Sequence, residues 1–109
     1  MDKILALEAL SALSQETRLD VFRLLVKAGP DGLYAGEIAQ RLCVRQNTMS
    51  TNLGVLSRAG LVRSEREGRS IRYFADLGGM RRLLAFLMQD CCGGHPETCR
   101  PFLEDLVCA

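Results

Sequence analysis

The sequence predicts a mainly α-helical fold with a small β-hairpin, of the winged helix-turn-helix type. Two helical segments come first, followed by a short helix, a tight turn and another helix. Two strand-like runs then follow, with a turn signal between them. Arginines gather in this part of the chain. Residues 41–73 contain seven Arg and two Glu, a local charge of +5 in a chain whose net charge is +1.

The first two helices are predicted over residues 2–13 and 15–28. The first is apolar around much of its circumference, so another element or a partner subunit must cover it. Ser14 is the predicted N-cap of the second helix. The Gly-Pro-Asp-Gly run at residues 29–32 then breaks the chain. The core stripe of the second helix is expected to consist of its apolar residues: Leu19, Val21, Phe22, Leu24, Leu25 and Val26.

A helix-turn-helix is predicted next. A short helix over residues 35–42 leads into a tight turn at Cys43 and Val44, and a second helix runs from about Arg45 to Arg58. Apolar residues recur in this second helix at helical spacing and predict one buried stripe. The stripe consists of Met49, Leu53 and Leu56. The other face of the helix carries short hydrogen-bonding side chains and no acid.

The chain then predicts a basic hairpin and a last helix. Strands are expected over residues 61–66 and 69–75, joined at Glu67-Gly68 by a tight turn. Asp76 can cap a long helix over about residues 77–91, which is again more apolar than a small monomer needs.

This order of elements predicts double-stranded DNA as a partner. The major groove admits an α-helix, whose polar side chains read the base edges, and the hairpin reaches the flanking backbone or minor groove. Arg45 can meet a phosphate at the start of the second helix. An ordinary solvated helix face and a winged helix that binds only proteins are the alternatives. The arginines favour DNA. The predicted DNA-binding residues are Arg45, Gln46, Asn47, Thr48, Ser50, Thr51, Arg66 and Arg69.

Several stretches, taken together and in order, resemble the ArsR/SmtB family of metal- and metalloid-responsive repressors. They are Leu13–Leu25, Glu37-Ile38-Ala39, the run Asn52–Val62, Glu67-Gly68-Arg69 and Arg72-Tyr73. The resemblance covers the chain to about residue 90. It implies a homodimer joined by its first and last helices, binding to a dyad-symmetric operator, and release when an effector binds.

Three cysteines lie within nine residues after the last predicted helix: Cys91, Cys92 and Cys99. Thiolates select soft or borderline ions, and the glycines and proline between these cysteines allow a turn. Arsenite can exchange its three hydroxyls for three thiols, and antimonite should behave alike. Zinc prefers four ligands and would need His95 or Cys108 as well. The arrangement resembles a subgroup of arsenite-responsive repressors whose three cysteines follow the last helix.

The sequence therefore predicts a metalloid-responsive repressor that is released from DNA when As(III) or Sb(III) binds these three thiolates. A repressor of the same fold that responds to zinc or cadmium, or to oxidation of these nearby cysteines to a disulfide, is the alternative. Residues 1–90 are expected to form the DNA-binding and dimerisation domain, and residues 91–109 the inducer-binding tail. Cys43 is expected to be a small buried core residue.

Other classes of protein are disfavoured. Cys99 and His95 lie four residues apart, but both fall in a predicted loop with no acidic side chain to orient them, so neither an enzyme nor a catalytic cofactor is expected. No apolar run approaches the ~20 residues that span a bilayer, so no membrane partner is expected. The apolar run at residues 4–7 is too short for a secretory signal and is followed by the acidic Glu8. This favours a cytoplasmic protein with reduced thiols.

Overall fold

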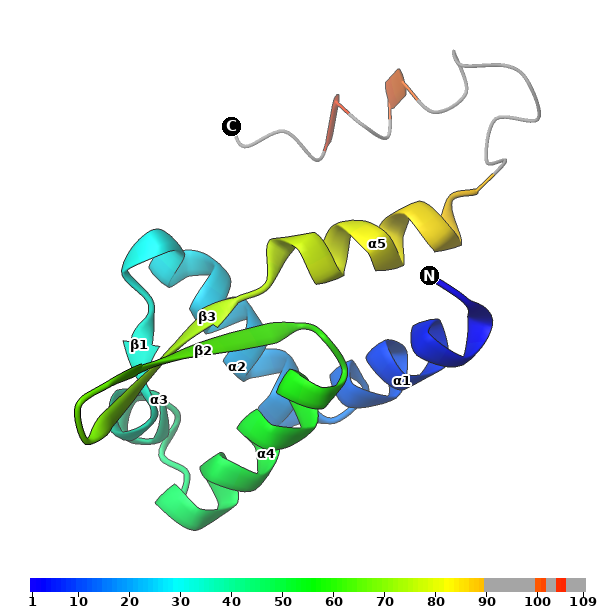
Figure 1. The fold of residues 1–109 in the computed structure, drawn as a ribbon. Coiled ribbons are helices and arrows are strands. Elements are labelled where there is room, and N and C mark those ends of the chain that lie inside the picture. Colours follow the sequence, from blue (N-terminus) through cyan, green and yellow to red (C-terminus); the bar gives the residue numbers. More distant parts are fainter. Residues whose placement is uncertain (90–99, 102–103, 106–109) are drawn as a thin grey trace.

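The computed structural model describes residues 1–89, 100–101 and 104–105, and these residues form a mainly helical fold with one small sheet (Figure 1). The elements in chain order are α1 (Lys3–Leu13), α2 (Glu16–Ala28), the 3₁₀ helix η1 (Gly29–Asp31), β1 (Leu33–Tyr34), α3 (Ala35–Leu42), α4 (Gln46–Arg58), β2 (Val62–Glu67), β3 (Ser70–Ala75) and α5 (Leu77–Leu87). The predicted winged helix-turn-helix is confirmed, with α3 and α4 as its helices and β2 and β3 as its wing. None of the described helices is long and apolar enough to cross a membrane.

The core lies where α4 meets the helices before it. Its predicted stripe is confirmed, because Met49, Leu53 and Leu56 are all 0% exposed. Helix α2 adds Val21 and Leu25 to the same cluster of buried residues. In Figure 1 helices α1, α2, α3 and α4 lie together, and the wing extends from one side of them.

Two details predicted for α2 are wrong. Leu19 and Val26 are exposed, because six apolar residues in one helix occupy more of its circumference than the core can cover. Ser14 does not cap α2. It ends α1, and its backbone N–H donates to the carbonyl oxygen of Ser11. The N-cap of α2 is Gln15, whose side chain accepts a hydrogen bond from the N–H of Arg18 over 2.9 Å.

The sheet has three antiparallel strands in the order β1-β3-β2, one strand more than predicted. Strand β1 has only two residues, too few to show a periodic pattern, and pairs Leu33 with Tyr73 of β3. The hairpin turn lies one residue later than predicted, because Glu67 still pairs with Ser70. Gly68 is therefore the first residue of a two-residue turn, and its φ of 62° suits that position.

Helix α5 begins where predicted and ends earlier. Asp76 caps it, and its Oδ1 accepts from the N–H of Gly79 over 3.0 Å. The helix ends at Leu87 rather than near residue 91, with Met88 as its C-cap. The backbone at residues 100–101 and 104–105 is also helical. The start of α5 is attached to the segment between α4 and β2, because the N–H of Asp76 donates to the carbonyl oxygen of Leu61 over 2.8 Å.

We expect the substitution Gly79→Ala to lower the free energy of unfolding by roughly 2–3 kcal/mol, the upper part of the usual range of overpacking effects. A Cβ at this buried position would overlap the carbonyl oxygen of Gly60, so the two backbones would have to separate. Chemical denaturation measures the change. The matched control is Gly54→Ala in α4, where a Cβ would meet only the flexible end of Arg58 at 3.4 Å. This control should gain up to about 1 kcal/mol from helix propensity. Unchanged stability of Gly79→Ala would contradict the close approach.

Candidate nucleic-acid interface

The first half of helix α4 presents the predicted recognition residues on the surface. Arg45 is the N-cap residue of the helix, and the first turn contains no acidic side chain. The free N–H groups at this end favour an anion such as a phosphate. All six predicted residues of this segment are exposed: Arg45, Gln46, Asn47, Thr48, Ser50 and Thr51. The structure thus brings them together on one surface.

Some polar groups of this surface already have partners within the protein. The Oδ1 of Asn47 accepts from the N–H of Thr48 over 2.8 Å, and the hydroxyl of Thr51 donates to the carbonyl oxygen of Asn47 over 3.1 Å. The amide of Gln46 lies against the start of α3, because a Cβ built on Gly36 would be 3.2 Å from its Nε2. The hydroxyls of Thr48 and Ser50 and the Asn47 amide nitrogen are the groups best placed for contact outside the protein.

Two arginines of the wing, Arg63 and Arg72, form ion pairs within the hairpin. Arg63 pairs with Glu65 over 3.0 Å and lies over the ring of Phe74, 4.3 Å from its centroid. Arg72 pairs with Glu67 over 2.9 Å. Both acids of the basic segment are thereby engaged on one face of the hairpin.

Arg66 and Arg69 lie at the tip of the wing. Both are exposed, and neither has an ion-pair partner among the residues that the structure describes. The local positive charge is therefore carried by the remaining exposed arginines of the segment: Arg41, Arg45, Arg58, Arg66 and Arg69.

A hydrogen-bonded cluster fixes the wing to the helix-turn-helix. The Tyr34 hydroxyl, at the N-cap of α3, donates to Glu67 over 2.5 Å. Arg72 donates to the same hydroxyl over 2.7 Å and to the carbonyl oxygen of Asp31 over 2.6 Å. The hydrogen bond from Arg72, followed by that from Tyr34, lowers the pKa of Glu67. The cluster joins β1, β2 and β3 beside α3.

The prediction that Cys43 is a buried core residue is wrong, because its side chain is exposed. Cys43 is the C-cap of α3 and has a left-handed backbone with φ of 55°. Its N–H bonds back to the carbonyl oxygen of Gln40, and this reversal of the chain directs the side chain away from the core. The thiol therefore lies on the turn that leads into α4.

The predicted sulfur site lies outside the described residues, and so do His95 and Cys108. Cys91, Cys92 and Cys99 follow the end of α5 in the sequence, the first of them by four positions. Within residues 1–89, 100–101 and 104–105, no group of three His, Cys, Asp or Glu side chains is placed to hold a metal ion.

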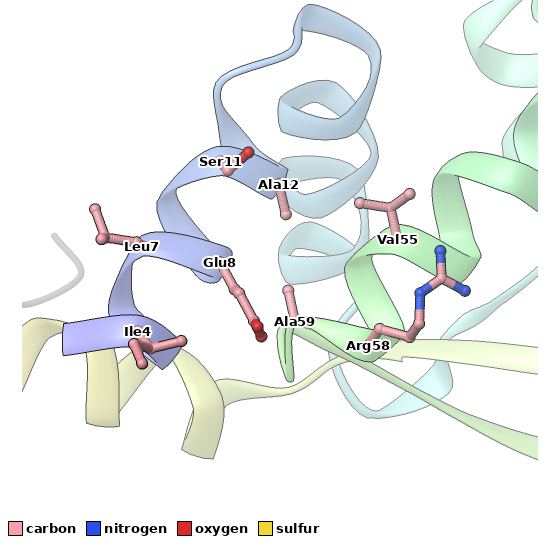
Figure 2. Close-up of a pocket in the computed structure, with 8 residues that line it drawn as sticks. All are labelled: Ile4, Leu7, Glu8, Ser11, Ala12, Val55, Arg58 and Ala59. Carbon is pink, nitrogen blue, oxygen red and sulfur yellow. The ribbon is translucent and has the colours of Figure 1, made fainter. Parts of the chain in front are cut away.

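Helices α1 and α5 contact each other at the end of the molecule that lies opposite the wing tip in Figure 1. Both expose large apolar side chains there, among them Ile4, Leu5, Leu7 and Leu10 of α1 and Leu84 and Leu87 of α5. A groove of about 570 Å³ lies between α1 and α4. Figure 2 shows Glu8 of α1 and Arg58 of α4 among its lining side chains.

Known proteins share this architecture. Residues 13–65 match the family model described as a helix-turn-helix domain. The HTH-type transcriptional regulator YbzH of Bacillus subtilis is 32% identical over an alignment of 95 positions, and the match covers 74% of this chain and 93% of YbzH. The structure of HlyU from Vibrio cholerae is 31% identical with a TM-score of 0.62, and the match covers 80% of this chain and 97% of HlyU.

Two further structures bear on assembly and regulation. Mb0332 from Mycobacterium bovis is a homodimeric winged helix-turn-helix DNA-binding domain of a possible ArsR-family regulator. It is 27% identical with a TM-score of 0.64, over 86% of this chain and 83% of that one. A possible transcriptional regulator for arsenical resistance is 28% identical with a TM-score of 0.65, over 73% of this chain and 80% of that one.

The homodimeric neighbour supports a dimer for this fold, and the exposed apolar side chains of α1 and α5 agree with it. The recognition helix and wing of this chain, together with its relatives, identify its family. The chain belongs to the DNA-binding winged helix-turn-helix transcriptional regulators of the ArsR and HlyU type.

Proposed function

We propose that the protein is a metalloid-responsive repressor, which binds operator DNA as a dimer through α4 and the wing. As(III) or Sb(III) binds Cys91, Cys92 and Cys99 and releases the repressor from DNA. The observation that carries this proposal is the position of these cysteines in the sequence, three within nine residues and the first of them four positions after the end of α5. The similarity to a possible regulator for arsenical resistance supports it.

The chemistry of the inducer requires three sulfurs and no fourth ligand. Arsenite is neutral As(OH)₃ near neutral pH, and three thiols replace its hydroxyls as three waters leave. The product is a pyramidal AsS₃ unit with a lone pair at its apex, and antimonite forms the same unit. Residues 91–109 are the proposed inducer-binding tail, and residues 1–90 the DNA-binding and dimerisation domain. No catalytic cofactor takes part, and we assign the protein to the cytoplasm, where thiols stay reduced.

A thiol-redox regulator is the second candidate, and the exposure of Cys43 favours it. This thiol lies two residues before Arg45, at the entry to the recognition helix. Oxidation to a sulfenic or sulfinic acid would place a new polar or negative group beside the DNA-binding surface. The two candidates therefore use different cysteines.

The assignment of the sensor is tested on the protein–DNA complex under reducing conditions. Arsenite and antimonite should each release the DNA, as followed by fluorescence anisotropy. Substitution of Cys91, Cys92 or Cys99 by Ser should abolish release. As(III) or Sb(III) bound by only two thiolates keeps one hydroxyl, which exchanges with water. Cys43→Ser is the matched control and should respond as wild type.

Zinc, cadmium and hydrogen peroxide are titrated separately against the same complex. Release by peroxide that depends on Cys43, with no release by arsenite, would establish the redox regulator instead. Release by zinc or cadmium alone would establish the metal-responsive alternative. Arsenite-dependent release that survives the loss of Cys92 would refute the proposed site.

The wing arginines are expected to contact phosphates. Each phosphate contact contributes about 0.9 to the slope of log K against log salt concentration. In a dimer, Arg66→Ala or Arg69→Ala should therefore reduce this slope by about 2, because two wings lose a contact. Arg63→Ala is the control on the same hairpin and should leave the slope unchanged, since Arg63 is paired with Glu65. Equal changes for Arg63 and Arg66 would contradict the role of the wing tip.

The dimer is expected to form through the apolar faces of α1 and α5. Leu7→Glu and Leu84→Glu should each shift the protein to monomers in sedimentation experiments, because a charge would be buried in the interface. Operator affinity should fall together with the dimer fraction. Leu19→Glu, at an exposed leucine of α2, is the control and should leave the dimer intact. A monomeric wild-type protein that still binds a dyad operator with high affinity would rule out this assembly.

A further inference from the structure

One side chain of α2 joins the recognition helix to the first helix. Asn52 lies on the inner side of α4 and is 7% exposed, the one buried polar residue in the described part of the chain. Its Oδ1 accepts a hydrogen bond from Nη1 of Arg18 over 3.2 Å. Nε of the same guanidinium donates to the carbonyl oxygen of Ala12, in the last turn of α1, over 2.7 Å. Arg18 thus contacts α1 and α4 at the same time.

We propose that Arg18 and Asn52 are positioning residues for operator binding, which fix the rotation of α4 about its own axis. The apolar contacts of Met49, Leu53 and Leu56 hold α4 in the core, but such contacts are non-directional. The guanidinium group is planar, and its N–H bonds point in fixed directions. Two hydrogen bonds from one such plane therefore define an orientation that apolar packing alone leaves adjustable.

A small rotation of α4 is enough to affect recognition. Side chains of a helix extend about 5–6 Å from its axis, so a rotation of about 10° moves their ends by about 1 Å. The usual range of hydrogen-bond lengths is only about 0.5 Å wide. Thr48 and Ser50 lie on the exposed part of the same helix and rotate with it. A contact that restrains this rotation therefore protects base recognition.

Stability alone gives a weaker account of the contact. Removal of one partner leaves a buried polar group without its hydrogen bond, which is unfavourable. Replacement of both partners by apolar side chains of similar shape is often nearly neutral. Only the carbonyl oxygen of Ala12, in the last turn of α1, then loses a hydrogen-bond partner. A double replacement can therefore separate the effect on orientation from the effect on stability.

The experiment compares Arg18→Met, Asn52→Leu and the double variant Arg18→Met/Asn52→Leu. The probe is a duplex that the wild-type protein selects from a pool of random duplexes, and an unrelated duplex measures non-specific binding. Thermal unfolding and circular dichroism report on stability and fold. Arg23→Met, at an exposed arginine of the same helix, is the matched control and should behave as wild type.

The double variant should melt within a few degrees of the wild type, yet bind the selected duplex about 10-fold more weakly, comparable to the loss of one good base contact. Its non-specific affinity and its salt dependence should stay unchanged, because the phosphate-binding arginines are intact. A double variant of wild-type stability that keeps the wild-type ratio of specific to non-specific affinity would overturn the proposal.

Arg18→Lys decides the question if the double variant does not fold. Lysine keeps the positive charge but cannot donate to both acceptors along two fixed directions. We expect a folded protein whose ratio of specific to non-specific affinity falls several-fold. A wild-type ratio for Arg18→Lys would show that charge alone suffices, and the proposed role in orientation would be wrong.

Discussion

The burial of one side of helix α4 is the constraint on which the rest of the structure depends. Met49, Leu53 and Leu56 are completely buried, and full burial of such side chains contributes about 1.5–3 kcal/mol each. No single surface contact of the helix has a comparable effect. Because this stripe settles which side of α4 faces the core, it also settles that the polar side chains from Gln46 to Thr51 face outward. The recognition surface is therefore a consequence of packing.

The wing shows how a segment with both charges can still present a positive surface. Its two glutamates pair with Arg63 and Arg72 on one face of the hairpin, and Arg72 also ties the wing to Tyr34. These interactions use charge to hold the wing in place beside α3. The tip is then left with Arg66 and Arg69, whose charges are available to a polyanion. Arg72 therefore fixes the position of the wing, and the two tip arginines, which have no ion-pair partner among the described residues, supply its positive potential.

The sequence predicted those features that repeat along the chain or depend on one residue type. Helical periodicity identified the stripe of α4, and the cap at Asp76 identified the start of α5. The predictions failed where the outcome depends on tertiary context. A two-residue strand has no period, and the exposure of Leu19 depends on which neighbours cover α2. Free cysteine is among the most buried residue types, which predicts Cys43 in the core, but its left-handed backbone turns the side chain outward. The cysteines at 91, 92 and 99 stay a prediction from spacing alone.

The geometry of α5 limits how an inducer bound beyond it can act. The helix has 11 residues and is about 16 Å long, and its first turn is fixed by the contact of Gly79 with the backbone of Gly60. A tilt of about 10° about this contact would move the far end of α5 by about 2 Å and the anchored end hardly at all. Within one subunit, such a tilt would therefore leave the end of α4 in place.

On the proposed function, the inducer must then act on the relation between the two subunits, because the far end of α5 lies in the apolar surface that joins them. Helix α1 shares that surface and also packs against α4, and Arg18 of α2 donates hydrogen bonds both to Ala12 of α1 and to Asn52 of α4. A change in how the two subunits pack is passed on to both recognition helices as rigid bodies. Operator half-sites lie about 34 Å apart or at a multiple of this distance, so a displacement of a few ångströms weakens both contacts together. The sensor can therefore lie far from the DNA-binding surface without altering a single side chain of α4.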